Sequence, residues 1–146
     1  MKTQKGNILD VEDGIICHQV NCQGKMGAGL AKGIRNRFPK VYKEYMKLYN
    51  EGGLKVGNIQ VVPVDVHLSV INMMAQDKYG RHRRYTDYKA FRNCLKKIKK
   101  FMKEYGYDES RLYFPYKIGC NLAGGEWNII ESMIEKYFPN ATIMKC

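Results

Sequence analysis

The first residues that could do chemistry lie in the stretch 15–31, which reads I-I-C-H-Q-V-N-C-Q-G-K-M-G-A-G-L-A. An apolar run leads through His18 and Asn21 into a glycine-rich segment, after which a helix is predicted. The first N–H groups of a helix lack partners and lie at the positive end of its dipole, so they favour an anion. Gly27 and Gly29 would let the backbone approach a phosphate closely. For this stretch alone, an ordinary strand-to-helix turn that needs glycine is the alternative.

A second stretch, 112–127, repeats this order with the sequence L-Y-F-P-Y-K-I-G-C-N-L-A-G-G-E-W. A strand-like run ends in another glycine-rich loop, 119–125, and a predicted helix follows. Two units of this kind indicate two phosphates bound from two sides, as in a diphosphate. The spacing of the first stretch is neither G-x-G-x-x-G nor G-x-x-x-x-G-K-[ST], so it meets neither the Rossmann nor the P-loop fingerprint.

Four side chains near these loops are candidates for a chemical role. His18 is the only histidine near either loop, and an imidazole titrates near neutral pH, so it could act as acid, base or nucleophile. A structural role is the alternative for His18. Asn21 could hydrogen-bond a ribose hydroxyl through its amide or serve as a turn residue. Asp77, in the polar segment after the middle strand, is a candidate helper, and Trp127 could cover a sugar or base, although we favour packing beneath the loop.

Strands and helices that largely alternate must position these residues, which predicts a mixed, mostly parallel sheet between helical layers. Strands are predicted over 1–9, 14–20, 57–64, 66–75, 112–118 and 141–145, and helices over 29–37, 41–50, 86–105 and 126–137. Pro115 is expected at a bulge or near the end of its strand, because proline cannot donate to the ladder. His67 is expected in a surface turn. The apolar residues of the last helix that should face the core are Ile129, Ile130, Met133 and Ile134.

The chain resembles the macrodomain family, the α/β/α modules that bind ADP-ribose. The resemblance lies in four segments in family order: K-G-N-I-L at 5–9, H-Q-V-N-C-Q-G at 18–24, M-G-A-G-L-A at 26–31 and I-G-C-N-L-A-G-G-E-W at 118–127. It implies the α/β fold class, as one macrodomain over 1–146. The implied architecture is a three-layer α/β/α domain with a mixed, mostly parallel central sheet.

The resemblance also implies which residues bind the ligand. Asn7 stands where many macrodomains have an aspartate that contacts adenine, so it keeps an acceptor but loses the charge. Asn21 matches the asparagine that faces the distal ribose. The implied ligand-binding residues are Asn7, Ile8, Gly24, Met26, Gly27, Ala28, Gly29, Leu30, Ile118, Gly119, Cys120, Asn121, Leu122, Ala123, Gly124, Gly125 and Trp127. The expected catalytic residues are His18, Asn21 and Asp77.

The resemblance implies a hydrolase that acts on an ADP-ribose derivative. His18 matches a histidine of the branch that includes ADP-ribose-1″-phosphate phosphatases and terminal ADP-ribose glycohydrolases. The glycohydrolases use a lysine and an aspartate where this chain has Gln76 and Ala123, although Lys78 is near. These departures argue against a lysine-linked intermediate. The segments A-G-G-E-W at 123–127 and A-Q-D-K-Y-G at 75–80 resemble the small stand-alone, phosphatase-like members, which implies ADP-ribose-1″-phosphate as the substrate. The alternatives are an ADP-ribosyl hydrolase acting on protein or nucleic acid, an ADP-ribose reader without chemistry, and a nucleic-acid-binding protein.

Length and composition bound the class of protein. A chain of 146 residues that is 45% hydrophobic fits one soluble domain with a real core. No apolar run approaches the length of a membrane span, and the polar start M-K-T-Q-K-G-N lacks the core of a signal peptide. We therefore expect a cytoplasmic protein without a membrane partner. The five cysteines form no C-x-x-C pair and are expected to be free thiols, with no metal and no cofactor.

The net charge of +11 suits polyanionic partners in general. Much of this charge lies on one predicted helix, so we interpret it as a solvated face and do not expect a nucleic-acid partner. The expected partner is a small nucleotide ligand, ADP-ribose or a derivative, or the ADP-ribose group of an ADP-ribosylated macromolecule. We expect a monomer.

Overall fold

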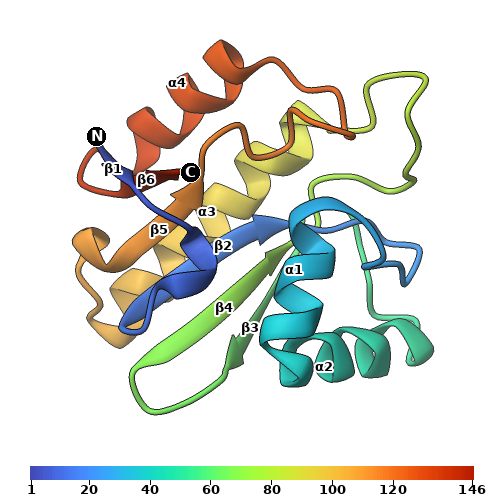
Figure 1. The fold of residues 1–146 in the computed structure, drawn as a ribbon, viewed down its shortest axis with the longest axis horizontal. Coiled ribbons are helices and arrows are strands. Elements are labelled where there is room, and N and C mark those ends of the chain that lie inside the picture. Colours follow the sequence, from blue (N-terminus) through green and yellow to red (C-terminus); the bar gives the residue numbers. More distant parts are fainter.

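Six strands form one sheet, and four α-helices cover its two faces, in the computed structural model, which describes residues 1–146 (Figure 1). The strands are β1 (Lys2–Lys5), β2 (Gly14–Gln19), β3 (Ile59–Pro63), β4 (Leu68–Met73), β5 (Leu112–Pro115) and β6 (Thr142–Lys145). The helices are α1 (Gly29–Arg37), α2 (Pro39–Asn50), α3 (Tyr88–Tyr105) and α4 (Trp127–Tyr137), with short 3-10 helices η1 (Ile8–Asp10) and η2 (Glu109–Arg111).

The strand order is β1-β6-β5-β2-β4-β3, and every neighbouring pair is parallel except the antiparallel pair β3–β4. This confirms the predicted mixed, mostly parallel sheet. The alternation of side chains along β2 divides the core into two halves. Ile15 and Cys17 pack with α3 and α4, whereas Ile16 packs with α1 and α2. Both faces of the sheet are therefore buried, which gives the expected three layers.

Besides shifts of one or two residues at the ends of elements, three details differ from the sequence prediction. The segment 1–9 is not one strand: β1 ends at Lys5, and the Asn7 side chain accepts a hydrogen bond from Leu9 N at 2.9 Å and so caps η1. The strand predicted over 112–118 ends already at Pro115, so the proline does lie at its end. Ile129 is 37% exposed and does not face the core. It precedes the buried stripe Ile130, Met133 and Ile134 by one position, about 100° around the helix.

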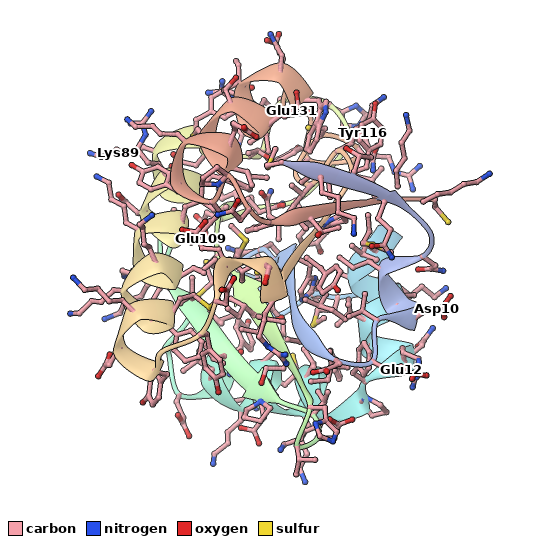
Figure 2. All side chains as sticks on the ribbon, turned by 90° about the vertical axis from the view of Figure 1, so that its left-hand side faces the viewer. Asp10, Glu12, Lys89, Glu109, Tyr116 and Glu131 are labelled. Carbon is pink, nitrogen blue, oxygen red and sulfur yellow. The ribbon has the colours of Figure 1, made fainter.

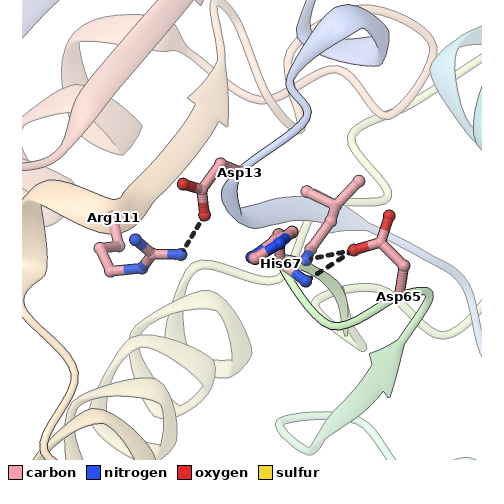
Figure 3. Close-up of polar contacts among 5 residues, drawn as sticks. Asp13, Asp65, His67 and Arg111 are labelled. Carbon is pink, nitrogen blue, oxygen red and sulfur yellow. Dashed lines mark hydrogen bonds and ion pairs between the residues drawn. The ribbon is translucent and has the colours of Figure 1, made fainter.

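His67 lies in the turn before β4, at the amino end of that strand, as predicted (Figure 3). The turn is held by Asp65, whose Oδ1 accepts from His67 N at 2.7 Å and Leu68 N at 2.9 Å. Nearby, Arg111 forms an ion pair with Asp13 and joins η2 to the entry of β2. The exposed His67 ring belongs to no group of three His, Cys, Asp or Glu side chains that could hold a metal ion.

The two glycine-rich loops leave neighbouring strands at the same edge of the sheet. β2 and β5 are parallel partners, with Ile15 opposite Leu112, so the loops that follow them meet at their carboxyl ends. In open α/β sheets this is where ligands bind. None of the helices combines the length and the apolar composition that crossing a membrane requires.

Candidate functional site

A cleft of about 900 Å³ opens at the carboxyl ends of β2 and β5. Its walls come from both glycine loops, from residues 6–8, from the start of α1 and from residues 79–81. Met144 and Cys146, beside β1, complete the end of the cleft near η1. This volume lies within the range of small-molecule and cofactor sites.

Most of the predicted site residues line this cleft. Those that do are Asn7, Ile8, His18, Asn21, Gly24, Met26, Gly27, Ala28, Gly29, Leu30, Ile118, Gly119, Asn121, Leu122 and Ala123. Those outside its lining are Asp77, Cys120, Gly124, Gly125 and Trp127.

The residues outside the lining have structural contacts instead. Trp127 meets Tyr116 edge to face, with ring centroids 5.1 Å apart. Gly125 N donates to Gly119 O at 2.8 Å, inside the second loop. The Asp77 carboxylate accepts from Gln23 Nε2 at 2.8 Å, and so links the first loop to the segment after β4. Trp127 is thus engaged in a packing contact, and the ligand contact implied by the resemblance stays a prediction.

Both loops present backbone N–H groups that donate to no backbone carbonyl. Ala28 precedes α1 and provides no side-chain cap, so the first N–H groups of that helix are left for a ligand. The N–H groups of Gly27 and Ala28 donate to no backbone oxygen, and neither do those of 121–123 in the second loop. An anion in the cleft could therefore be bound from two sides.

The charged side chains of the cleft reinforce this preference. No aspartate or glutamate is among the lining residues, whereas Lys25, Arg35, Arg81 and Lys117 are. Sequence reasoning missed these four cations. Lys25 and Lys117 were visible beside the glycines, but Arg35 and Arg81 reach the cleft only through the fold. The cleft thus favours an anion, because positive side chains add to free backbone N–H groups.

Asn21 holds the first loop in shape. Its Oδ1 accepts from Gln23 N at 3.0 Å and Lys25 N at 3.3 Å, and its Nδ2 donates to Lys25 O at 2.8 Å. The hydroxyl of the buried Tyr45 on α2 lies 2.7 Å from Asn21 O and 2.9 Å from Oδ1. Burial raises the pKa of Tyr45, so it remains a donor at all ordinary pH values. The side-chain amide of Asn21, which the sequence suggested as a ribose contact, is therefore already hydrogen-bonded within the first loop.

The second loop is tied to β2 by Gln19 and Thr86, which sequence reasoning did not assign to the site. Gln19 Nε2 lies 2.8 Å from both Gln76 Oε1 and Thr86 Oγ1, and Thr86 Oγ1 donates to Gly119 O at 2.6 Å. The next residue, Asp87, caps α3 by accepting from Ala90 N. Nothing local in the sequence marks Gln19, because its partners lie far along the chain.

His18 is a buried residue of β2, only 1% exposed, at the floor of the cleft. A chain of hydrogen bonds determines its tautomer. Gln60 Nε2 donates to Glu44 O, and Asn72 Nδ2 donates to Gln60 Oε1, so Asn72 Oδ1 faces His18 Nε2 as an acceptor. Nε2 must therefore carry the proton, and Nδ1, which is buried without a partner, has a free lone pair.

Burial lowers the pKa of His18 from 6.5 to about 4, and the bond to Asn72 opposes this shift only in part. The imidazole is therefore neutral at pH 7, with a proton on Nε2 and an acceptor at Nδ1. It can accept a hydrogen bond or a proton at Nδ1, but it has no proton to donate from that atom. Of the roles expected for His18, base and nucleophile fit this state and general acid does not.

The buried neutral His18 makes the stability of the fold depend on pH. Between pH 6.5 and about 4 the unfolded chain binds a proton that the folded chain does not. The stability that His18 provides by staying neutral in the fold is fully present above pH 6.5. It is lost as the pH falls from 6.5 to about 4, where the free energy of unfolding decreases by about 3 kcal/mol in total. Urea unfolding from pH 7 to pH 4 should show a smaller decline for His18→Gln, which does not titrate. Parallel declines for the two proteins would contradict the assignment.

Comparisons with known proteins agree with this geometry. The profile of the Macro domain family matches residues 17–134. An uncharacterized 17.5 kDa protein from the tk-vs intergenic region of Enterobacteria phage T4 is 31% identical over 144 residues, covering 94% of this chain and 89% of that protein.

Solved structures share the fold. A protein of unknown function from Bacteroides thetaiotaomicron is similar, with a TM-score of 0.88 and 25% identity, covering 99% of this chain and 97% of that one. Thermosipho africanus DarTG in complex with ADP-ribose is similar with a TM-score of 0.82 and 19% identity, covering 99% of this chain and 42% of that one.

Proposed function

The chain belongs to the Macro domain family, an ADP-ribose-binding fold, and from that premise we propose that its cleft binds ADP-ribose. The observation that carries the proposal is the cleft between two loops of free N–H groups, whose lining contains no aspartate or glutamate. A diphosphate needs anion contacts on two sides, and this cleft offers them. Thermosipho africanus DarTG, whose structure contains ADP-ribose, has a similar fold, which supports a ligand of this class.

The ligand would lie across the carboxyl ends of β2 and β5. Its diphosphate would lie between the loops, at Gly27 and Ala28 on one side and residues 121–123 on the other. Adenine would occupy the end near Asn7, whose Oδ1 already caps η1 but has a second lone pair to offer. The distal ribose would then lie over His18, beside the loop that Asn21 organises.

We propose further that the protein hydrolyses an ADP-ribose derivative at the distal ribose, with ADP-ribose-1″-phosphate as the first substrate to test. His18 Nδ1 would accept a proton from a water, and the resulting hydroxide would attack phosphorus. The bond from phosphorus to the 1″ oxygen would break, and that oxygen would take a proton from solvent. The loop N–H groups would stabilise the charge on the phosphoryl oxygens.

The second candidate is release of ADP-ribose from a protein or nucleic-acid carrier. It is favoured by the rim of the cleft, where Tyr79 and Arg81 are exposed and would lie beside an attached carrier. A lysine-linked intermediate is not part of either proposal. Gln76 stands at the lysine position with its amide bonded to Gln19 and Lys78 O, and Ala123 has no carboxylate.

Calorimetry with ADP-ribose tests the binding proposal. We expect 1:1 binding that is tighter than binding of ADP, because the first loop, which Asn21 holds in shape, continues past the diphosphate and would enclose the distal ribose. EDTA should leave the affinity unchanged, since no group of three His, Cys, Asp or Glu side chains could hold a metal ion. The absence of heat at millimolar ADP-ribose would remove the proposal.

Product analysis separates the two reactions. The protein is incubated with ADP-ribose-1″-phosphate, and separately with ADP-ribosylated protein and ADP-ribosylated DNA. We expect inorganic phosphate from the first. Release of ADP-ribose from a modified carrier, without any phosphate from the first substrate, would favour the second candidate over the phosphatase. If none of the three substrates gives a product, the remaining function is that of an ADP-ribose-binding module without catalysis.

A further inference from the structure

Nearly all of the net charge of the chain lies in one segment, 78–103. It contains eleven of the 25 lysines and arginines but only one of the 14 acidic residues, so it carries +10 of the net +11. The eleven cations are Lys78, Arg81, Arg83, Arg84, Lys89, Arg92, Lys96, Lys97, Lys99, Lys100 and Lys103, and all of them are exposed. We call this segment, with its eleven cationic side chains, the basic strip. The rest of the chain is almost neutral, so the strip is a localised feature of the surface.

The cations of the basic strip are largely unneutralised. Only Lys99 is in an ion pair, with Glu109 at 3.6 Å. The single acidic residue of the segment, Asp87, accepts from Ala90 N and caps α3. Figure 2 shows Lys89 directed away from the sheet on the outer side of α3. Like charges held together without partners cost free energy, and a bound polyanion would remove that cost.

The basic strip begins at the cleft. Arg81 lines the cleft, and the following residues are bonded to the second glycine loop. Tyr85 N and Thr86 N donate to Ala123 O at 2.7 and 3.1 Å, and Ala123 also lines the cleft. A Cβ built on Gly124 would lie 3.1 Å from the backbone of Arg83, so loop and strip are in direct contact. The strip then continues along α3, which leads away from the loop 81–86 (Figure 1).

The geometry of the basic strip fits a regular polyanion. Lys89, Arg92, Lys96 and Lys103 lie at helical spacing along α3, over about 21 Å at 1.5 Å per residue. A strand of a double helix carries one phosphate per about 3.4 Å of axis, and an extended single strand carries fewer, so in either form more than one phosphate could pair with this row. At the cleft end, the Arg84 guanidinium lies over the Tyr88 ring, 4.3 Å from its centroid, and both are groups on which a base can stack.

A membrane surface fits the basic strip less well. The apolar residues of α3, such as Phe91, Leu95 and Ile98, are fully buried against the sheet. An interfacial helix needs an apolar face to insert, and α3 has none available. The observations therefore favour a soluble polyanion with regularly spaced charges.

We propose that the basic strip is a docking surface for a nucleic-acid strand, and that the ADP-ribose group read in the cleft is carried by that strand. This rests on the proposed binding of ADP-ribose in the cleft. It reverses our expectation from the sequence, where the charge was interpreted as a solvated helix face. The fold adds what the sequence lacked, the direct contact between the strip and the second glycine loop.

The test uses an unmodified, fluorescein-labelled single strand of about 20 nucleotides and measures anisotropy over a range of salt concentrations. The test variant is Lys89→Gln/Arg92→Gln/Lys96→Gln on α3. The matched control is Lys40→Gln/Lys43→Gln/Lys47→Gln, three exposed lysines with the same spacing on α2, in the opposite helical layer. Both variants remove three charges from an exposed helix face, and neither touches the cleft.

We expect the test variant to bind the strand about tenfold more weakly at low salt and its log–log salt slope to fall by about 2, while the control stays within about threefold of the parent. Equal losses in the two variants would overturn the proposal, because net charge alone would then explain binding. Failure of the parent to bind would overturn it too. Equally tight binding of polyglutamate of the same charge would assign the strip to acidic proteins instead.

Calorimetry with free ADP-ribose keeps this result separate from the proposed function. Both triple variants should bind ADP-ribose as the parent does, because their substitutions lie outside the cleft. A parent that binds the oligonucleotide but not ADP-ribose would refute the function proposed for the cleft and with it the ADP-ribosylated carrier, leaving only the docking surface.

Discussion

A Gly27→Glu variant should fold as the parent does and bind ADP-ribose at least about 100-fold more weakly, a loss of about 2.7 kcal/mol. Gly27 lines the cleft, and a Cβ built there meets no atom within 4 Å. The backbone therefore tolerates a side chain, but the glutamate would enter the space proposed for a phosphate and repel it. Calorimetry measures the affinity, and thermal unfolding shows that the fold is retained.

Gly27→Ala is the matched control, and it should change the affinity no more than a few-fold. Gly125 would be a poor substitute for this test. A Cβ on Gly125 would lie 2.6 Å from Gly119 O, so substitution there would deform the second loop whatever the ligand does. Unchanged ADP-ribose affinity in a folded Gly27→Glu protein would show that no phosphate lies at the first loop.

A His18→Gln variant should lose about two to four orders of magnitude in turnover of ADP-ribose-1″-phosphate. Glutamine has an amide nitrogen where histidine has Nε2, so it can still donate to Asn72 Oδ1. It has no counterpart of Nδ1, the atom proposed to accept the proton. The variant therefore removes the base and keeps the packing, whereas alanine at this buried position would also leave a cavity and an unpaired amide.

Two readouts separate a catalytic His18 from a structural one. ADP-ribose affinity and the midpoint of thermal unfolding at pH 7 should stay close to those of the parent, while phosphate release falls. Full phosphate release by His18→Gln would exclude Nδ1 as the base. A low pKa also predicts that phosphate release by the parent does not decline between pH 8 and pH 5 through protonation of His18.

The helices were predictable because their apolar residues recur at helical spacing and because glycine or proline marks their ends. The helix predicted over 29–37 has those bounds, and Gly106 ends α3 in the left-handed conformation that favours glycine. The strand after η2 was overestimated because the apolar run 112–118 continues past its last paired residue, Pro115, into a turn with Lys117 at φ 61°. A run of apolar residues indicates that a segment is buried, but a buried segment need not pair with a neighbouring strand.

The glycine loops were predictable for a similar reason, because glycine marks close backbone approach within a few neighbouring residues. The charge state of His18 was not predictable. The neutral charge follows from burial of the ring, and the tautomer depends on Asn72, Gln60 and Glu44 from two other strands and a helix, which meet only in the fold. The link from Gln19 through Thr86 to the second loop is of the same kind, and so is the contact of the basic strip with that loop.

The parallel pair β1–β6 has a consequence for the order in which the molecule assembles. Lys2 lies opposite Thr142, so this pair joins residues about 140 positions apart, whereas β3 and β4 are neighbours along the chain. Long closures cost more chain entropy than short ones, so the β1–β6 pair is expected to form late. Residues 6–8 and Met144, at the end of the cleft proposed for adenine, are placed by this pair. During synthesis, the nascent chain would therefore remain unable to hold a nucleotide until Thr142–Lys145 has left the ribosome.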